Sequence, residues 1–168
     1  MKFIFLDIDG VMNSEESCAG NLEKWKRGEP LSPLFSKEAV AALNYLVETT
    51  EAEVIITSTW RVGRSLGDIN HIFRSEGFPY GIWGVTPWLG KKRWHEIQAY
   101  LDQSQEIGYN ISGYVIVDDG TTMEQHNAHF VQTSNTKGLT LEKAAKAVEV
   151  LSLDYNYEPS QCMSQFPV

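Results

Sequence analysis

The chain has few cysteines, no long hydrophobic run and a shortage of positive charge. Its two cysteines, Cys18 and Cys162, lie far apart and lack the spacing of a metal site. We therefore expect reduced thiols rather than a disulfide framework or a zinc centre. The longest apolar run near the start, residues 3–6, is too short for a signal-peptide core or a membrane span. These absences predict a cytoplasmic protein that has no membrane partner.

The charge balance is acidic, with 14 Lys and Arg against 22 Asp and Glu and a net charge of −8. This balance argues against an extended electrostatic footprint on nucleic acid. It leaves room for short, local contacts, because basic residues cluster at 24–27, 61–64 and 91–93. With 168 residues, of which 42% are apolar, the chain has the size and composition of a single folded domain over residues 1–168.

Strand-like apolar segments alternate with helix-like ones along the chain. Continuous apolar runs predict strands that are buried on both faces at residues 3–6, 54–56 and 114–117, with a weaker run at 82–85. Apolar residues at helical spacing predict helices around residues 40–47 with Ser36 as N-cap, 66–75, 94–101, and 141–151 opened by Thr140. Such alternation requires crossover connections. We therefore expect an α/β fold, a doubly wound, Rossmann-like parallel sheet with helices on both faces.

Two segments fit this alternation poorly. Residues 14–35 are rich in glycine, proline and charge, and they directly follow the first strand. We interpret them as a loop or flap, since long loops in such places often cover a site. Residues 154–168 are expected to form a C-terminal tail. An insertion this small predicts a minimal cap over the site, or none.

Polar residues follow each of the three strong strands. They are Asp7, Asp9, Gly10 and Asn13 after the first, Thr57, Ser58, Thr59, Trp60 and Arg61 after the second, and Asp118, Asp119 and Gly120 after the third. In a doubly wound sheet the ligand site lies beyond the carboxyl ends of the strands, where the strand order reverses. We therefore expect these groups, together with the basic run at residues 91–93, to line one crevice.

Carboxylates from different strands suit Mg²⁺, which prefers oxygen ligands and retains several waters. A carboxylate that attacks a phosphate meets charge repulsion, so a metal ion and a cation are needed to neutralise the transition state. The pattern thus indicates a metal-dependent phosphoryl-transfer site.

Each of these features has a simpler explanation when it is taken alone. The dipeptides Asp9-Gly10 and Asp119-Gly120 are common in turns, and the other polar side chains could serve as helix caps, core packing or a surface ion pair. An Asp-x-Asp motif after a strand also occurs in nucleotide-sugar transferases and in Toprim domains, although Toprim domains require an earlier catalytic glutamate. The four histidines show no zinc spacing. The order of the features along one expected sheet edge favours the phosphoryl-transfer interpretation.

The motifs DIDGVMN, IITSTWR and VIVDDG, with a basic residue opening the helix before the last of them, resemble the haloacid dehalogenase (HAD) phosphatase superfamily in order and spacing over residues 3–120. The finer pattern of STWR, RWHEIQAYL and FVQTSNTKGLT resembles the HAD domains associated with nucleic-acid end repair, which are related to polynucleotide 3′-phosphatases.

The resemblance implies a role for each matching residue. Asp7 would be the nucleophile that forms an aspartyl-phosphate, and Asp9 the general acid and later the general base. The ligands of Mg²⁺ would be Asp7, the backbone carbonyl of Asp9, and the pair Asp118 and Asp119. Thr57 or Ser58 would bind the phosphoryl group. The cation would be Arg93, which can bind phosphate bidentately, with Lys91 and Lys92 as alternative phosphate-binding residues.

We therefore expect a Mg²⁺-dependent phosphomonoesterase that acts on a nucleic-acid 3′-phosphate end or a nucleotide. Asn13, Trp60 and Arg61 are the expected substrate contacts, and a crevice without a full lid would admit a large substrate. Two alternatives remain open. One is a small-metabolite phosphatase of the same superfamily, and the other is a non-catalytic binding or accessory domain on this fold.

Overall fold

The computed structural model of the chain describes residues 1–29, 33–153 and 155. Five parallel strands form one sheet in the order β3-β2-β1-β4-β5. They are β1 (Lys2–Leu6), β2 (Glu53–Ile56), β3 (Ile82–Val85), β4 (Gly113–Asp118) and β5 (Phe130–Gln132). The sequence predicts the first four, whereas β5 has only three residues and is too short to show a pattern. The strand order reverses between β1 and β4, which makes their carboxyl ends the switch point of the sheet.

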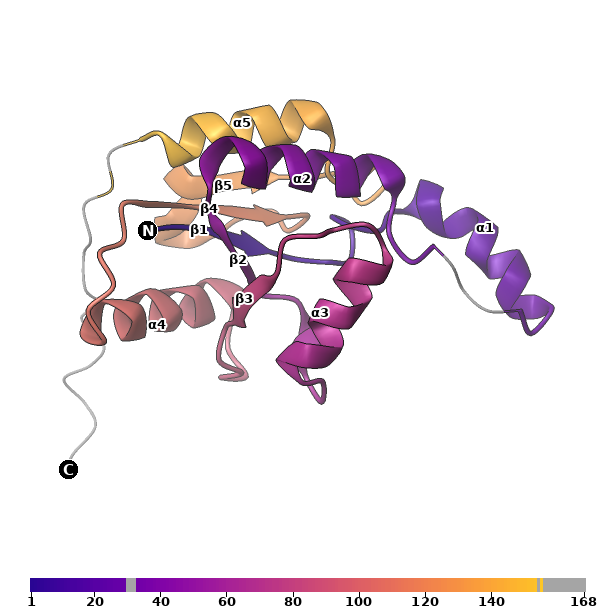
Figure 1. Cartoon of the computed structure of the whole chain (residues 1–168), viewed down its shortest axis with the longest axis horizontal. Helices are drawn as coiled ribbons and strands as arrows, with labels where there is room; N and C mark the ends of the chain where they lie inside the picture. Colours follow the sequence, from indigo (N-terminus) through magenta and orange to yellow (C-terminus); the bar gives the residue numbers. More distant parts are fainter. Residues whose placement is uncertain (30–32, 154, 156–168) are drawn as a thin grey trace.

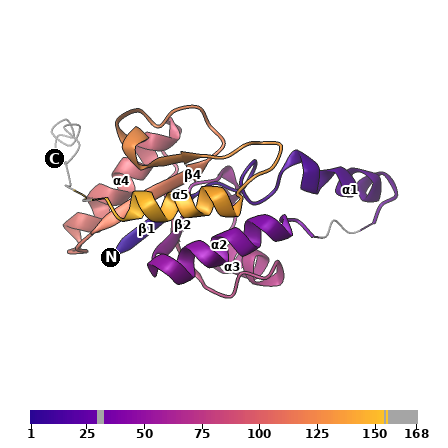
Figure 2. The same cartoon turned by 90° about the horizontal axis from the view of Figure 1, so that it is seen from above.

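Helices cover both faces of the sheet. The helices are α1 (Glu15–Lys26), α2 (Lys37–Thr50), α3 (Leu66–Ser75), α4 (Arg93–Glu106) and α5 (Leu141–Leu151), with short 3₁₀ helices η1 (Thr59–Arg61) and η2 (Glu124–His129). Helices α2 and α5 lie side by side on one face, and α4 lies on the other (Figures 1 and 2). The expected doubly wound α/β fold is confirmed.

The core is divided between the two faces of the sheet because successive side chains of a strand point in opposite directions. On β1, Ile4 and Leu6 pack with α2, α3 and α5, whereas Phe3 and Phe5 pack with α4. All four side chains are fully buried. This two-sided burial fixes the register of β1, because a slip of one residue would exchange the two faces. The position of Asp7, the next residue, is fixed by the same packing.

The helix starts agree with the capping signals in the sequence. The Ser36 side chain accepts a hydrogen bond from the Ala39 amide at the start of α2, and the Thr140 side chain accepts one from Lys143 at the start of α5, each at 3.3 Å. Such caps satisfy amides that lack a partner within the helix.

The segment over residues 14–35, interpreted above as a loop or flap, contains helix α1, which projects past the carboxyl ends of the strands (Figures 1 and 2). A capping box between Ser14 and Ser17 begins this helix. Its large apolar side chains, Leu22 and Trp25, are 54% and 68% exposed, so α1 adds no side chain to the core. Two large apolar side chains are too few to give this helix the apolar stripe that marks a packed helix in a sequence.

Parts of two expected segments, residues 30–32, 154 and 156–168, lie outside the described residues. Among the helices that are described, none combines the length and the apolar character that crossing a membrane requires.

A buried histidine of η2, His126, packs against Tyr114 of β4. His126 is 2% exposed, and its Nδ1 atom lies 2.8 Å from the hydroxyl of Tyr114. Burial lowers the pKa of His126 to about 4, aided by the nearby His129. The folded state therefore holds His126 neutral over a pH range in which an unfolded histidine takes up a proton.

This burial makes the stability of the fold sensitive to acid. Because the unfolded chain binds a proton below about pH 6.5 and the folded chain does not until about pH 4, we expect the free energy of unfolding to fall by about 2 kcal/mol from this residue between pH 7 and pH 5. In urea denaturation, the free energy of unfolding of a His126→Gln variant should fall less between pH 7 and pH 5 than that of wild type. The control His71→Gln, at an exposed histidine, should follow the wild-type curve. Equal acid sensitivity of His126→Gln and wild type would contradict this assignment.

Candidate active site

The polar ends of the central strands meet at one edge because backbone pairing continues one residue beyond the strands. The Asp7 amide donates to the Val117 carbonyl at 3.0 Å, and the Thr57 amide donates to the Leu6 carbonyl at 2.9 Å. Asp7 therefore lies between Thr57 on one side and the end of β4 on the other. This arrangement puts Asp7 at the switch point of the sheet.

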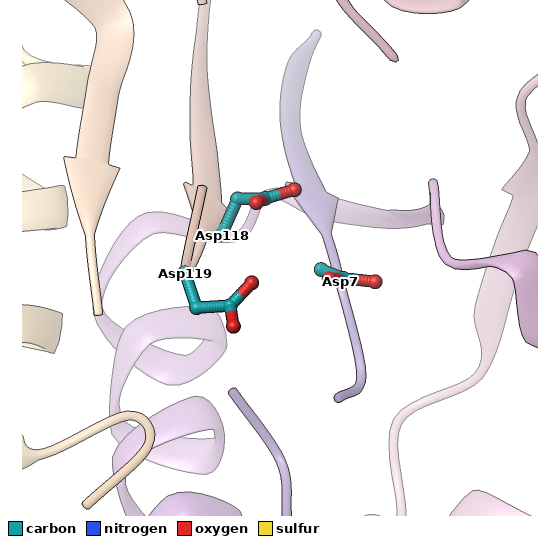
Figure 3. Close-up of side chains that lie close together, drawn as sticks. All are labelled: Asp7, Asp118 and Asp119. Carbon is teal, nitrogen blue, oxygen red and sulfur yellow. The ribbon is translucent and has the colours of Figure 1, made fainter. Parts of the chain in front are cut away.

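Three carboxylates converge at this point. One carboxylate oxygen from each of Asp7, Asp118 and Asp119 lies within 4.8 Å of the others. In Figure 3 the side chains of Asp118 and Asp119 extend from the end of β4 toward Asp7, which directly follows β1. Asp7 and Asp118 are only 5% and 3% exposed. The oxygen-only donor set and the close spacing fit a Mg²⁺ ion.

The electrostatics of the cluster favour a bound cation. Burial, with the neighbouring Asp7 charge, raises the pKa of both Asp118 and Asp119 above the usual range of a carboxyl group. The amide of Gly120 donates to Asp118 Oδ1 at 2.7 Å and orients that carboxylate. Carboxylates held this close repel one another, so a cation between them lowers their energy.

Arg93 supplies one such positive charge. It is the first residue of α4, and its Nη1 atom lies 2.7 Å from Asp7 Oδ2 and also contacts Asp118 Oδ2. Burial alone would lower the pKa of Arg93, but the charges of Asp118 and Asp7 outweigh burial and raise it. Of the three basic residues at 91–93, Lys91 is exposed, and Lys92 is paired with Glu124 on the surface. The structure thus joins Arg93 to the carboxylates and places the two lysines outside the cluster.

Asp9 is oriented by two donors outside the carboxylate cluster. Asn13 Nδ2 donates to Asp9 Oδ1 at 2.9 Å, and the indole Nε1 of Trp60 donates to Asp9 Oδ2 at 3.0 Å. Asp9 itself is exposed. Asn13 and Trp60, which we expected to contact substrate, therefore position a carboxyl group that faces solvent.

The two hydroxyl side chains that directly follow β2, Thr57 and Ser58, differ in their hydrogen bonding. The Ser58 side chain accepts a hydrogen bond from the Trp60 amide at 3.4 Å and caps η1. Thr57 Oγ1 is buried and has no hydrogen-bond partner within the described part of the chain. A buried hydroxyl without a partner is costly unless a ligand satisfies it. This difference favours Thr57 over Ser58 as the phosphoryl-binding residue.

Arg61, which we expected to contact substrate, lies in the interior instead. It is 7% exposed, and its guanidinium pairs with the buried carboxylate of Glu96 and donates to the carbonyls of Ser58 and Thr86 at 2.7 and 2.9 Å. Glu96 also accepts from the Leu89 amide at 2.9 Å. The pair thus ties the ends of β2 and β3 to the first turn of α4, which carries Arg93. The sequence shows no sign of this contact, because the two residues are 35 positions apart.

Gly10 is required by the close approach of Asp119. A Cβ atom at position 10 would lie 2.4 Å from Asp119 Oδ2, and the backbone there has φ of +73°. We expect Gly10→Ala to displace the Asp119 carboxylate, to lower turnover on the order of 10²-fold and to raise the Mg²⁺ concentration needed for activity.

Gly108→Ala is the matched control for this change. Gly108 also has a positive φ, +93°, but nothing lies within 4 Å of a Cβ placed there. The control should lose stability from backbone strain and keep its activity. Normal Mg²⁺ activation in Gly10→Ala would show that Asp119 does not belong to the metal site.

A parallel α/β sheet with clustered carboxylates and a cation at its switch point is the arrangement that the resemblance to HAD domains predicts. The comparisons with known proteins agree, because the model of one family matches residues 3–144 of this chain. The chain belongs to that family, described as the HAD domain in Swiss Army Knife RNA repair proteins. This membership makes the chain a HAD-type phosphoesterase at the level of the superfamily. Neither the search of curated proteins nor the search of solved structures gives a match.

Proposed function

We propose that this protein is a Mg²⁺-dependent phosphomonoesterase that removes the phosphate from the 3′ end of a nucleic acid, with RNA as the favoured substrate. The observation that carries the proposal is the cluster of Asp7, Asp118 and Asp119, with Arg93 in contact with two of them. The choice of RNA rests on the family, whose description names RNA repair.

Asp7 is the proposed nucleophile. Its carboxylate oxygen forms a bond to phosphorus, the bond between phosphorus and the 3′ oxygen of the substrate breaks, and an aspartyl-phosphate results. Asp9 donates its proton to the departing oxygen. Asp9 then accepts a proton from a water molecule that attacks the aspartyl-phosphate, which releases inorganic phosphate and restores both carboxyl groups. Asn13 and Trp60 hold Asp9 for both steps.

The remaining residues bind and neutralise the phosphoryl group. Arg93 donates to the transferring oxygens, since it already lies against Asp7, and Thr57 offers a hydroxyl that has no other partner in the described chain. Asp7, Asp118 and Asp119 would hold Mg²⁺, assisted by the carbonyl of Asp9, and the bound ion would supply positive charge for the phosphoryl oxygens.

The shape of the site supports a large substrate. A pocket of about 290 Å³ opens beside Arg93 and Asp118. The segment between Asp9 and α2, where a cap would be inserted, contains one helix among its described residues, α1, which projects away from the body of the domain (Figure 1). A polynucleotide end can therefore approach the carboxylates. A phosphatase that encloses a small metabolite under a lid would not need such an open approach.

The experiment is a phosphate-release screen over 3′-phosphorylated oligonucleotides, mononucleotides, sugar phosphates and an aryl phosphate, with and without EDTA. We expect the highest kcat/KM on the 3′-phosphorylated oligoribonucleotide and complete loss of activity in EDTA. A preference for sugar phosphates would favour the small-metabolite alternative. Hydrolysis of none of these esters in the presence of Mg²⁺ would favour a non-catalytic domain.

A further inference from the structure

An arginine outside the proposed catalytic machinery lies beside Asp9. Trp60 donates its indole N–H to Asp9 at 3.0 Å, and the guanidinium carbon of Arg64 lies over the indole ring of Trp60, 5.3 Å from its centroid. Arg64 Nη1 also donates to the Trp60 carbonyl at 2.9 Å. The indole of Trp60 thus contacts both the proposed general acid, Asp9, and the guanidinium of Arg64.

Arg64 is exposed, and no carboxylate lies within ion-pair distance of it among the residues that the structure describes. Some exposed cations are paired, as Lys26 is with Glu23 and Lys92 with Glu124, whereas Lys91 and Arg74 resemble Arg64 in having no ion pair among the described residues. Hydrogen bonds from Ser65 lower the pKa of Asp68, and the charge of Arg64 contributes to this shift without a direct ion pair. A guanidinium has five N–H donors, and one bond to a carbonyl leaves most of them available. The stacking on Trp60 holds the group in place, which reduces the entropy lost when an anion binds.

The position of Asp9 fixes where the leaving group must lie. A general acid must come within hydrogen-bond distance of the oxygen that it protonates. The nucleoside that leaves from the phosphate therefore lies against Asp9, and the cation that the structure holds beside Asp9, across the Trp60 indole, is Arg64. Since Arg64 covers one face of Trp60 and the ring also contacts Phe35, the indole is poorly placed to stack on a base.

We propose that Arg64, held by Trp60, binds the phosphodiester that precedes the 3′-terminal nucleotide of the substrate. The inference rests on the proposed function and adds to it a residue that selects for a polynucleotide end. A planar guanidinium matches two phosphate oxygens, and a mononucleotide or a sugar phosphate has no second phosphate to offer. One such contact also agrees with the acidic net charge of −8, which argues against a long footprint on nucleic acid.

The test compares wild type, Arg64→Ala and Arg64→Lys on three substrates, namely a 3′-phosphorylated trinucleotide, the nucleoside 3′-monophosphate with the same terminal base, and an aryl phosphate. We expect Arg64→Ala to lower kcat/KM about tenfold on the trinucleotide, mainly through KM, and to change the other two substrates by less than twofold. Arg64→Lys should recover part of the loss. The slope of log(kcat/KM) on the trinucleotide against log salt should become less negative by about 0.7 in Arg64→Ala.

Arg74→Ala, at an exposed arginine near the end of α3, is the matched control and should behave as wild type on all three substrates. Equal losses in Arg64→Ala on all three substrates, or no loss on any, would overturn the role of Arg64 and leave the proposed function standing. Hydrolysis of the aryl phosphate alone by wild type would overturn the proposed function, and this inference with it.

Discussion

Replacing Asp7 with asparagine is expected to abolish turnover, with a loss on the order of 10⁴-fold or more on every substrate. The neutral amide oxygen is a poor nucleophile, and losses of this size follow the removal of a covalent nucleophile in other enzymes. The fold should survive, because asparagine has the same shape and Arg93 keeps its contact with Asp118. Steady-state phosphate release and thermal unfolding of the same preparation measure the two effects together.

The control for Asp7→Asn is Glu106→Gln, which neutralises an exposed carboxylate at the far end of α4. It should match wild type in both activity and melting temperature. If Asp7→Asn is well folded and retains more than about one tenth of wild-type activity, Asp7 is not the nucleophile.

Replacing Arg93 with alanine is expected to give the second largest effect, a loss of about 10²- to 10³-fold in kcat. This is the usual cost of removing one preorganised donor to the transition-state charge. The change also removes the charge that opposes the repulsion between Asp7 and Asp118, and so the pKa of Asp118 should rise further above its usual range.

The Arg93→Lys variant distinguishes the contribution of the positive charge of Arg93 from that of the shape of its guanidinium group. Arg93→Lys should recover part of the loss because an ammonium group restores the charge but lacks the planar pair of N–H donors with which a guanidinium binds a phosphoryl group. Lys92→Ala is the comparison for the identity of the cation. Lys92 pairs with Glu124 on the surface, so its removal should cost far less than the removal of Arg93. A larger loss in Lys92→Ala than in Arg93→Ala would mean that the cation has been misassigned.

The convergence of Asp7 and Asp118 could be predicted from the sequence because it follows from topology. Each residue comes directly after a continuous apolar run, and parallel strands end at the same edge of their sheet. The prediction required only that the two strands be neighbours, which the pairing of β1 with β4 confirms. Arg93 was favoured over its lysine neighbours on chemistry, and the start of α4 at Arg93 places it against the carboxylates.

The supporting contacts could not be predicted, because they join residues whose spacing carries no pattern. Arg61 reads as a surface residue after a strand, yet its burial depends on Glu96 from another element. The role of Trp60 as a donor to Asp9 depends on a contact across 51 residues. Helix α1 was missed for a different reason. It is stabilised by its cap and not by burial, so it lacks the apolar stripe that reveals a packed helix.

The most direct test of the central claim is calorimetric titration of Mg²⁺ into wild type, Asp118→Asn and the control Glu106→Gln. The claim is that Asp7, Asp118 and Asp119 together hold one divalent ion at the switch point of the sheet. We predict one site in wild type and in Glu106→Gln, and at least tenfold weaker binding in Asp118→Asn. Unchanged Mg²⁺ affinity in Asp118→Asn, or the absence of binding to wild type, would contradict the account.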